Sequence, residues 1–261
     1  MIEELLAVAI AAGGEIMRIY DTDFAIRIKE DSSPVTEADE AAEAIIVAAL
    51  KRIAPDIAVV AEEAAAAGRI PETAQRFFLV DPLDGSKEFI TRNGEFTVNI
   101  GLIEGGIPVL GVVYAPALGR IWWGDRDSGA FHARVIDGVI SDGRNIRVRG
   151  CGSTGIEVVG SRSHGGSDVD AWLQRFQVAR FVPAGSSLKF CLLASGEADL
   201  YPRLGRTMEW DTAAGDAILR AAGGRVETMF GELLCYGKRN QSHDTDFANP
   251  HFVAFGDPAL V

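Results

Sequence analysis

Two carboxylates spaced three residues apart are the first feature of this sequence that could do chemistry. Asp81 and Asp84 follow an apolar run that is expected to form a strand, and Pro82 and Gly85 restrict the turn around them. Such a turn can direct both carboxylates the same way, and Leu83 adds its backbone carbonyl. Carboxylate and carbonyl oxygens are the ligands that Mg²⁺ prefers, so the segment predicts a magnesium site.

The residues that follow could bind an anion. The backbone N–H groups of Gly85 and Ser86 open a short predicted helix over 87–90, and a helix N-terminus attracts phosphate. An ordinary turn with solvated acids is the alternative interpretation. An EF-hand is disfavoured, because Leu83 and Arg92 stand where that calcium loop needs oxygen donors. The phosphatases that use a DxD nucleophile do not match the DxxD spacing.

Three more acids are candidates for the same site, and each also has a structural explanation. Glu62 ends the preceding strand and could be a surface acid, whereas Asp211 begins a helix over 212–222 and could only cap it. Asp39 lies three residues after Thr36, the spacing of a capping box, so local sequence favours capping over catalysis. Ligands collect beyond the carboxyl ends of strands in open α/β sheets. Converging carboxylates would repel one another without a cation.

Composition excludes several classes of protein. The 261 residues suit one large domain or two small ones, and 48% hydrophobic with 24% charged residues is typical of a folded chain. A net charge of −12 argues against a nucleic-acid polymer or an anionic membrane as a partner. Three cysteines without a CxxC pair indicate reduced, intracellular thiols rather than a disulfide framework or a zinc site.

The start of the chain is predicted to be an amphipathic helix rather than a signal peptide. Glu3 and Glu4 stand where a signal peptide carries positive charge, and no run reaches the roughly 18 apolar residues of a membrane span. We therefore expect a cytoplasmic protein with no transmembrane segment, and peripheral attachment at the inner membrane is left open.

The remaining pattern predicts two halves, 1–140 and 141–261. In the first, helices over 2–20 and 37–53 precede strands over 57–60 and 77–80 and an antiparallel meander over 96–123. Beyond a Gly- and Asp-rich stretch at 137–143, strands alternate with helices, which favours an α/β half with a largely parallel sheet. Its expected strands are 156–160, 179–183 and 199–202, and its expected helices are 169–176, 188–195 and 212–222.

Five blocks, in order along the chain, resemble the inositol monophosphatase superfamily of Mg²⁺-dependent, lithium-sensitive phosphatases, and most of all its bacterial 3′(2′),5′-bisphosphate nucleotidase branch. These blocks are 33–36 with 38–39, 62–63, 81–89, 93–99 and 210–215. The nucleotidase branch is suggested by 84–90, 161–164 and 185–190. The resemblance implies a layered αβαβα sandwich, in which N-terminal helices and an antiparallel sheet carry most metal ligands and the C-terminal α/β half completes the substrate site.

The resemblance also implies a mechanism. Two or three Mg²⁺ ions would be held by Glu62, Asp81, the Leu83 carbonyl, Asp84 and Asp211. Glu62, together with Asp39 paired to the Ser86 hydroxyl, would orient a metal-activated water for direct in-line attack on phosphorus. Gly85, Ser86 and Asp211 would in addition contact the substrate.

The implied reaction is hydrolysis of 3′-phosphoadenosine 5′-phosphate to AMP and phosphate, a step of sulfur metabolism. Its second phosphate needs contacts of its own, and a predicted helix opening beyond residue 184 could supply them. The candidates there are Gly185, Ser186, Ser187 and Lys189. A capped helix with a solvated lysine is the simpler alternative. His164 and Arg203 are weaker candidates for contact with the nucleotide.

Three residues depart from the family pattern. Ser86 stands where Thr is usual, Ala61 where Ser is frequent in this branch, and Arg206 where Pro is expected. Ser86 keeps the hydroxyl, so we expect activity to survive, whereas Arg206 leaves the substrate open. The alternative functions are an inositol monophosphatase or broad sugar-phosphate phosphatase, and a catalytically silent nucleotide or metal sensor. The expected partner is a small phosphorylated nucleotide, and a homodimer is left open.

Overall fold

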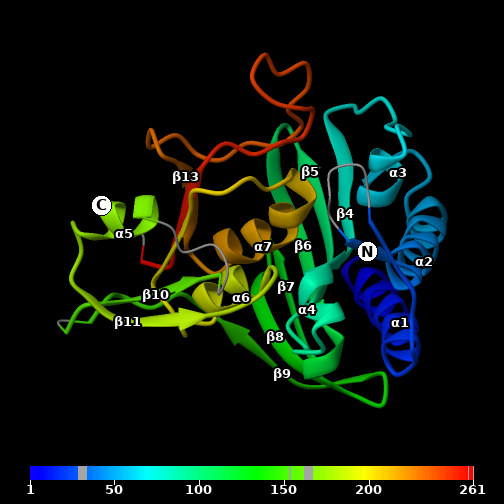
Figure 1. The fold of residues 1–261 in the computed structure, drawn as a ribbon, viewed down its shortest axis with the longest axis horizontal. Helices are drawn as coiled ribbons and strands as arrows, with labels where there is room; N and C mark the ends of the chain where they lie inside the picture. Colours follow the sequence, from blue (N-terminus) through cyan, green and yellow to red (C-terminus); the bar gives the residue numbers. More distant parts are fainter. Residues whose placement is uncertain (29–33, 153, 162–166, 258, 261) are drawn as a thin grey trace.

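Helices and sheets alternate in five layers (Figure 1). The computed structural model describes residues 1–28, 34–152, 154–161, 167–257 and 259–260. One helical layer lies on one face of a seven-stranded sheet, and a second helical layer separates that sheet from a five-stranded one. In the part of the chain that the structure describes, one short helix covers the far face of the smaller sheet. The predicted αβαβα sandwich is therefore confirmed.

The first layer consists of two amphipathic helices, α1 (Ile2–Tyr20) and α2 (Glu37–Ile53), whose bounds match the predicted ones. In α1, buried residues recur at spacings of four and three, which places them on one face of the helix. They include Leu5, Ala9, Ala12, Ile16 and Ile19. In α2 the buried face points at the same sheet. Each helix is amphipathic because only one of its faces packs against the larger sheet.

The larger sheet has the strand order β3-β4-β5-β6-β7-β8-β9. Strands β3 and β4 run parallel, and the remaining neighbours run antiparallel, so the predicted meander is confirmed. The strands are β3 (Ala58–Ala61), β4 (Arg76–Asp84), β5 (Thr97–Glu104), β6 (Ile107–Ala115), β7 (Arg120–Asp125), β8 (Gly129–Ile136) and β9 (Val139–Ile146). A 3₁₀ turn, η1 (Pro116–Leu118), joins β6 to β7.

One expectation about the first half is corrected. The strand that was predicted to end at residue 80 continues as β4 to Asp84, with an irregularity between Asp81 and Asp84. Pro82 lacks an N–H for the ladder, so the strand bulges there and then pairs again. The stretch 137–143 lies at the hairpin of β8 and β9, and β9 runs across residue 140. The division into 1–140 and 141–261 stays a prediction.

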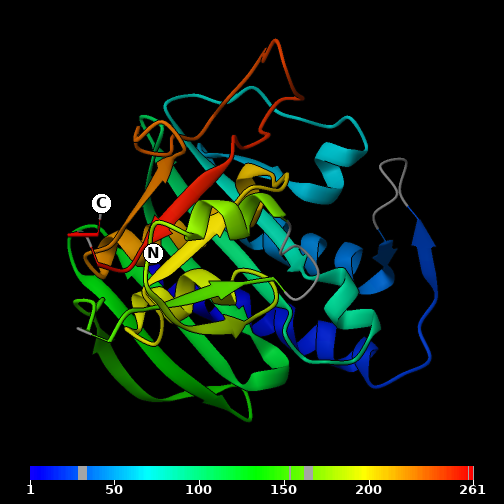
Figure 2. The ribbon, with the colours of Figure 1, turned by 60° about the vertical axis from the view of Figure 1, so that its left-hand side comes forward.

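The smaller sheet is mixed, and the expectation of a largely parallel sheet is wrong. Its order is β11-β10-β12-β14-β13, with two parallel and two antiparallel pairings. The last strand, red in Figure 2, lies between β12 and β13 and runs against both. The strands are β10 (Ile156–Gly160), β11 (Val178–Pro183), β12 (Leu200–Arg203), β13 (Arg225–Thr228) and β14 (Phe252–Phe255). Helix α5 (Ser167–Leu173) covers the outer face.

Shorter elements complete the chain. Helices α3 (Glu62–Ala66) and α4 (Ser86–Ile90) follow β3 and β4, and β1 (Ile26–Ile28) pairs with β2 (Pro34–Thr36). The middle helical layer consists of α6 (Leu188–Ala194) and α7 (Glu209–Ala221). Among the described residues, no helix is both long enough and apolar enough to cross a membrane.

Helix α7 packs directly against the larger sheet, over a row of glycines. The row runs across three neighbouring strands. Gly101 on β5 pairs with Gly111 on β6, which pairs in turn with Gly124 on β7. A Cβ at Gly101 would lie 2.9 Å from the Cβ of Ala213, and one at Gly111 would overlap the carbonyl of Ala214. The glycines therefore set how deeply α7, and the carboxylate at its N-terminus, sits against the sheet.

We expect Gly111→Ala to destabilise the protein by about 1–3 kcal/mol, because the added methyl overlaps the backbone of α7. Gly14→Ala is the matched control, since Gly14 is an exposed residue of α1 with nothing within 4 Å of an added Cβ. That change should stabilise the helix by about 0.5–1 kcal/mol. Urea unfolding measures both changes, and equal stability of Gly111→Ala and the parent would contradict the packing argument.

Candidate active site

Three carboxylates meet at the edge where the larger sheet faces α7. Glu62 is the first residue of α3, directly after β3, and Asp81 belongs to the neighbouring parallel strand β4. Asp211 lies in the first turn of α7. One oxygen of each carboxylate lies within 4.8 Å of the others. Because β3 and β4 are parallel, their carboxyl ends reach the same edge, as the sequence argument expected.

The electrostatics of this cluster favour a cation. Burial raises the pKa of Asp81 well above its usual value, and the charges of Glu62, Asp84 and Asp211 raise it further. Burial likewise raises the pKa of Asp211, followed by the charges of Asp84 and Glu62. Carboxylates packed this closely are unfavourable as anions unless positive charge lies among them. An all-oxygen donor set of this kind suits Mg²⁺.

Asp84 lies beside the cluster and is held by hydroxyls from the second half of the chain. Its Oδ2 accepts hydrogen bonds from Ser186 Oγ at 2.7 Å and Ser187 Oγ at 3.0 Å. Asn99 Nδ2 lies 3.5 Å from the same oxygen and also donates to Ser187 Oγ. These donors fix the orientation of the carboxylate, and the role of Asp84 as a metal ligand stays a prediction.

Asp39 uses its two oxygens for different purposes. Its Oδ2 accepts hydrogen bonds from the backbone N–H and the hydroxyl of Thr36, both at 2.8 Å, which confirms the predicted capping box. Its Oδ1 accepts a hydrogen bond from Ser86 Oγ at 3.4 Å. The carboxyl is 2% exposed. Capping and pairing with Ser86 therefore occur together, and the catalytic roles of both residues stay predictions.

Asp211 shows the same double use. Its Oδ2 accepts a hydrogen bond from the backbone N–H of Met208 at 2.8 Å, so it does cap α7, which begins at Glu209 rather than at 212.

Gly85 precedes α4 with a φ of +93°, a conformation that favours glycine. The Leu83 N–H donates to Asp81 Oδ1 at 3.0 Å, which fixes the bulge, whereas the metal role of the Leu83 carbonyl stays a prediction.

A cavity of about 130 Å³ opens beside the cluster. Residues from both halves of the chain line it. They include Asp84, Gly85, Ser161, Ser186, Ser187, Lys189, Tyr201, Arg203 and Asp211. Acidic and basic side chains both line the cavity, so it could hold a phosphorylated ligand in contact with a cation and with Lys189 and Arg203.

The predicted second-phosphate segment is not a simple capped helix. The Gly185 N–H donates to Glu95 Oε2 at 2.7 Å, and the hydroxyls of Ser186 and Ser187 donate to Asp84. Lys189 is 5% exposed, so the alternative of a solvated lysine is wrong. Its Nζ donates to the Ser186 carbonyl at 2.6 Å, and burial lowers its pKa to about 8.

The remaining predicted contacts differ in their surroundings. Arg203 lines the cavity, and its guanidinium donates to the carbonyls of Gly205 and Arg206 at 3.2 and 3.1 Å. Arg206 pairs with Asp244 at 3.0 Å. His164 lies outside the described residues. The roles of these side chains toward a nucleotide stay predictions.

Sequence reasoning missed the polar residues that hold the others in place. Asn99 and Glu95 fell within a recognised block but were given no role, and Glu43 was not considered. Glu43 lies four residues after Asp39 on the same face of α2, and this spacing gives no indication of its contact with the first turn of α3. None of the three carries a feature in its local sequence that distinguishes it from an ordinary surface residue.

Comparison with known proteins identifies the family. Residues 1–250 match the model of the inositol monophosphatase family. The chain is 44% identical over 254 residues to the 3′(2′),5′-bisphosphate nucleotidase CysQ of Salmonella typhimurium, covering 97% of this chain and 98% of that protein. The chain therefore belongs to the inositol monophosphatase family.

Two solved structures agree with this assignment. CysQ from Bacteroides thetaiotaomicron, a bacterial member of the inositol monophosphatase family, superposes with a TM-score of 0.78 at 34% identity, over 97% of this chain and 96% of that one. An IMPase from Thermotoga maritima gives a TM-score of 0.75 at 25% identity, over 98% and 91%. Within the family, nucleotidases and inositol monophosphatases thus share this fold.

We expect Asp81→Asn to stabilise the protein when divalent cations are chelated, because it removes a buried charge and keeps the acceptor for the Leu83 N–H. A carboxyl whose pKa is raised on folding destabilises the protein as the pH rises from the pKa in the unfolded state toward the pKa in the folded state. Between pH 4 and neutrality, the parent should therefore lose more stability than the variant. Urea unfolding in EDTA measures this, and a variant that is less stable throughout would contradict it.

Proposed function

We propose that the chain is a phosphoric monoester hydrolase that removes the 3′-phosphate of 3′-phosphoadenosine 5′-phosphate to give AMP and phosphate. The observation that carries the proposal is the carboxylate cluster of Glu62, Asp81 and Asp211 beside the Asp39–Ser86 pair. The substrate is supported by nucleotidase relatives at up to 44% identity over nearly the whole chain. The proposed cofactor is Mg²⁺.

Glu62, Asp81, Asp84 and Asp211 would hold Mg²⁺, with the Leu83 carbonyl as a further oxygen ligand. When bound, Mg²⁺ would acidify a water, polarise the phosphoryl oxygens and neutralise the leaving ribose oxygen. The protein's own contribution is to keep these oxygens in place before the substrate arrives. The hydroxyls of Ser186 and Ser187 serve this purpose by holding Asp84. Positioning and charge neutralisation dominate phosphoryl transfer, so no covalent intermediate is needed.

The Asp39–Ser86 pair would orient the attacking water. Ser86 Oγ donates its proton toward Asp39 Oδ1, so the lone pairs of Oγ face away from Asp39 and can accept a proton from water. Because Thr36 holds the other oxygen of Asp39, the direction of this pair is fixed. As the water attacks phosphorus, its proton passes to Ser86 Oγ and the hydroxyl proton moves onto Asp39 Oδ1.

Lys189 and Arg203 are the proposed contacts for the second phosphate, because both are basic side chains that line the cavity. The hydroxyls and the N–H of residues 185–187 already bind carboxylates, so we give that segment the role of holding Asp84. His164 is kept as a proposed contact on the strength of the resemblance alone.

The first test compares two substrates. With Mg²⁺, we expect kcat/KM for 3′-phosphoadenosine 5′-phosphate to exceed that for inositol 1-phosphate by about 100-fold, equivalent to about 2.7 kcal/mol of transition-state preference. Lithium should inhibit both reactions. Asp81→Asn and Asp84→Asn should lose turnover and stay folded. Equal or reversed specificity would favour the inositol monophosphatase alternative, and tight nucleotide binding without phosphate release would favour a sensor.

The second test concerns Lys189. Lys189→Met keeps the buried stem and removes the ammonium, so we expect KM for the bisphosphate to rise by about 10- to 100-fold, as for a lost charge-assisted hydrogen bond. KM for a monophosphate should change much less. In the parent, KM for the bisphosphate should also rise above about pH 8, where the ammonium is lost. An equal rise for both substrates would contradict the assignment.

A further inference from the structure

We infer that Glu43 is a positioning residue for Glu62. One turn of helix α2 then holds two parts of the site, because Glu43 contacts the helix that carries Glu62 and Asp39 contacts Ser86. The inference rests on the proposed function, since it concerns the Mg²⁺ site named there. Nothing in the local sequence of Glu43 predicts such a role, and the evidence is its contacts.

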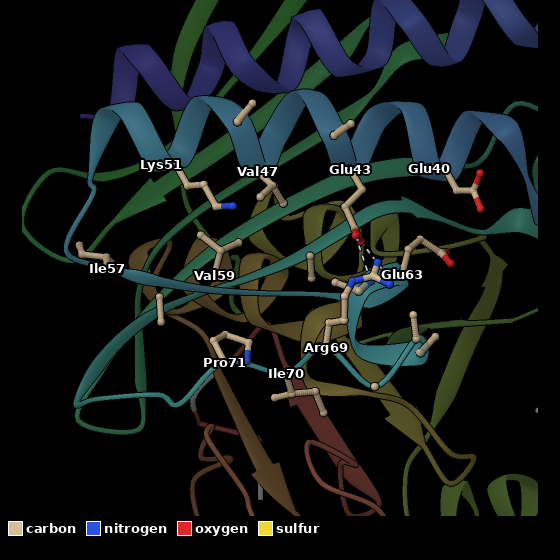
Figure 3. Close-up of a pocket in the computed structure, with 18 of the residues that line it drawn as sticks. Glu40, Glu43, Val47, Lys51, Ile57, Val59, Glu63, Arg69, Ile70 and Pro71 are labelled. Atoms are coloured by element: carbon tan, nitrogen blue, oxygen red, sulfur yellow. Dashed lines mark hydrogen bonds between the residues drawn. The ribbon is translucent and has the colours of Figure 1, made fainter.

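The carboxylate of Glu43 binds the start of the helix that carries Glu62. Its Oε2 accepts the backbone N–H of Glu63 at 2.7 Å, and its Oε1 accepts that of Ala64 at 2.9 Å. Figure 3 shows Glu43 reaching from α2 to this first turn of α3. The side chain is 8% exposed, and burial raises its pKa while these two N–H groups lower it. Two carboxylate oxygens thus replace the cap that a neighbouring side chain would supply.

Helix α3 is too short to hold its own geometry and needs an anchor from another element. It has five residues, none of them buried, and Ala61 before it provides no side-chain cap. An isolated helix of this length is not stable in water, so its geometry must come from contacts with the rest of the protein. Glu43 therefore supplies from a distance the hydrogen bonds that residue 61 cannot make.

The position of Glu43 on α2 links two parts of the site. Asp39 and Glu43 are four residues apart, so they lie on the same face of the helix about 6 Å apart along its axis. Asp39 holds Ser86 at one end of this turn, and Glu43 holds the first turn of α3 at the other. Helix α2 packs on α1 and β4, so one helix anchored to the larger sheet carries both contacts.

A groove of about 1650 Å³ lies beside this contact, lined by α2, β3, α3 and the following loop. Glu43 lies on its wall together with Glu63 and Arg69 (Figure 3). Arg69 lowers the pKa of Glu43 and the charge of Glu63 raises it. A substitution at Glu43 therefore alters the wall of an existing groove and leaves no cavity in a closed core. For this reason, effects on metal binding can be separated from collapse of the fold.

The test is calorimetric titration of substrate-free protein with Mg²⁺. Glu43→Gln keeps the size of the side chain but replaces one acceptor oxygen with an NH₂ group. That group cannot accept a hydrogen bond from the backbone N–H that it faces. We expect Mg²⁺ affinity to fall by about tenfold or more, as is usual when a group that orients a metal ligand is lost. The matched control is Glu40→Gln on the same helix, whose exposed side chain pairs with Arg27 at the surface. It should bind Mg²⁺ as the parent does.

A second variant separates positioning from folding. Ala61→Ser supplies a local cap, because Ala61 already has the extended backbone of an N-cap residue. In the Glu43→Gln background it should restore most of the Mg²⁺ affinity and lower the Mg²⁺ concentration needed for half-maximal activity. Parent-like affinity of Glu43→Gln, or a loss that Ala61→Ser leaves unchanged, would overturn the inference. Absence of Mg²⁺ binding by the parent would instead overturn the proposed function.

Discussion

The repulsion between neighbouring carboxylates is the constraint on which the rest of this structure depends. Oxygens of Glu62, Asp81 and Asp211 lie within 4.8 Å of one another, and Asp84 adds a fourth charge nearby. No single element could hold such a group together. Two parallel strands bring the first acids to one edge, and the row of glycines lets α7 approach closely enough to add Asp211. The rigidity of the scaffold opposes a repulsion that a cation would relieve.

Several side chains near the cluster serve structure and site together. Asp39 and Asp211 each give one oxygen to a helix N-terminus, which fixes the carboxylate before any ligand arrives. Ser187 donates to Asp84 and lies at the start of α6, so it ties the second half of the chain to the first. A structural explanation for such a residue is therefore no argument against a functional one, because capping supplies the preorganisation that catalysis needs.

The sequence predicted most strongly what local periodicity and motif spacing determine. The bounds of α1 and α2, the antiparallel meander and the approach of Glu62, Asp81 and Asp211 to one another were all confirmed. The mixed order of the second sheet was missed, because β14 inserts between strands that are distant in sequence and no local pattern encodes its direction. The burial of Lys189 and the long-range contact of Glu43 were missed for the same reason, since both depend on packing between separate elements.

If this cluster is a divalent-cation site, a crystal structure with Mn²⁺ in place of Mg²⁺ should show the ion there. Anomalous scattering from Mn²⁺ locates the ions without reference to the protein model. We expect Mn²⁺ in contact with the carboxylates of Glu62, Asp81 and Asp211, with Asp84 Oδ1 and the Leu83 carbonyl as further ligands. Mn²⁺ bound only elsewhere, with these carboxylates left as they are here, would contradict it.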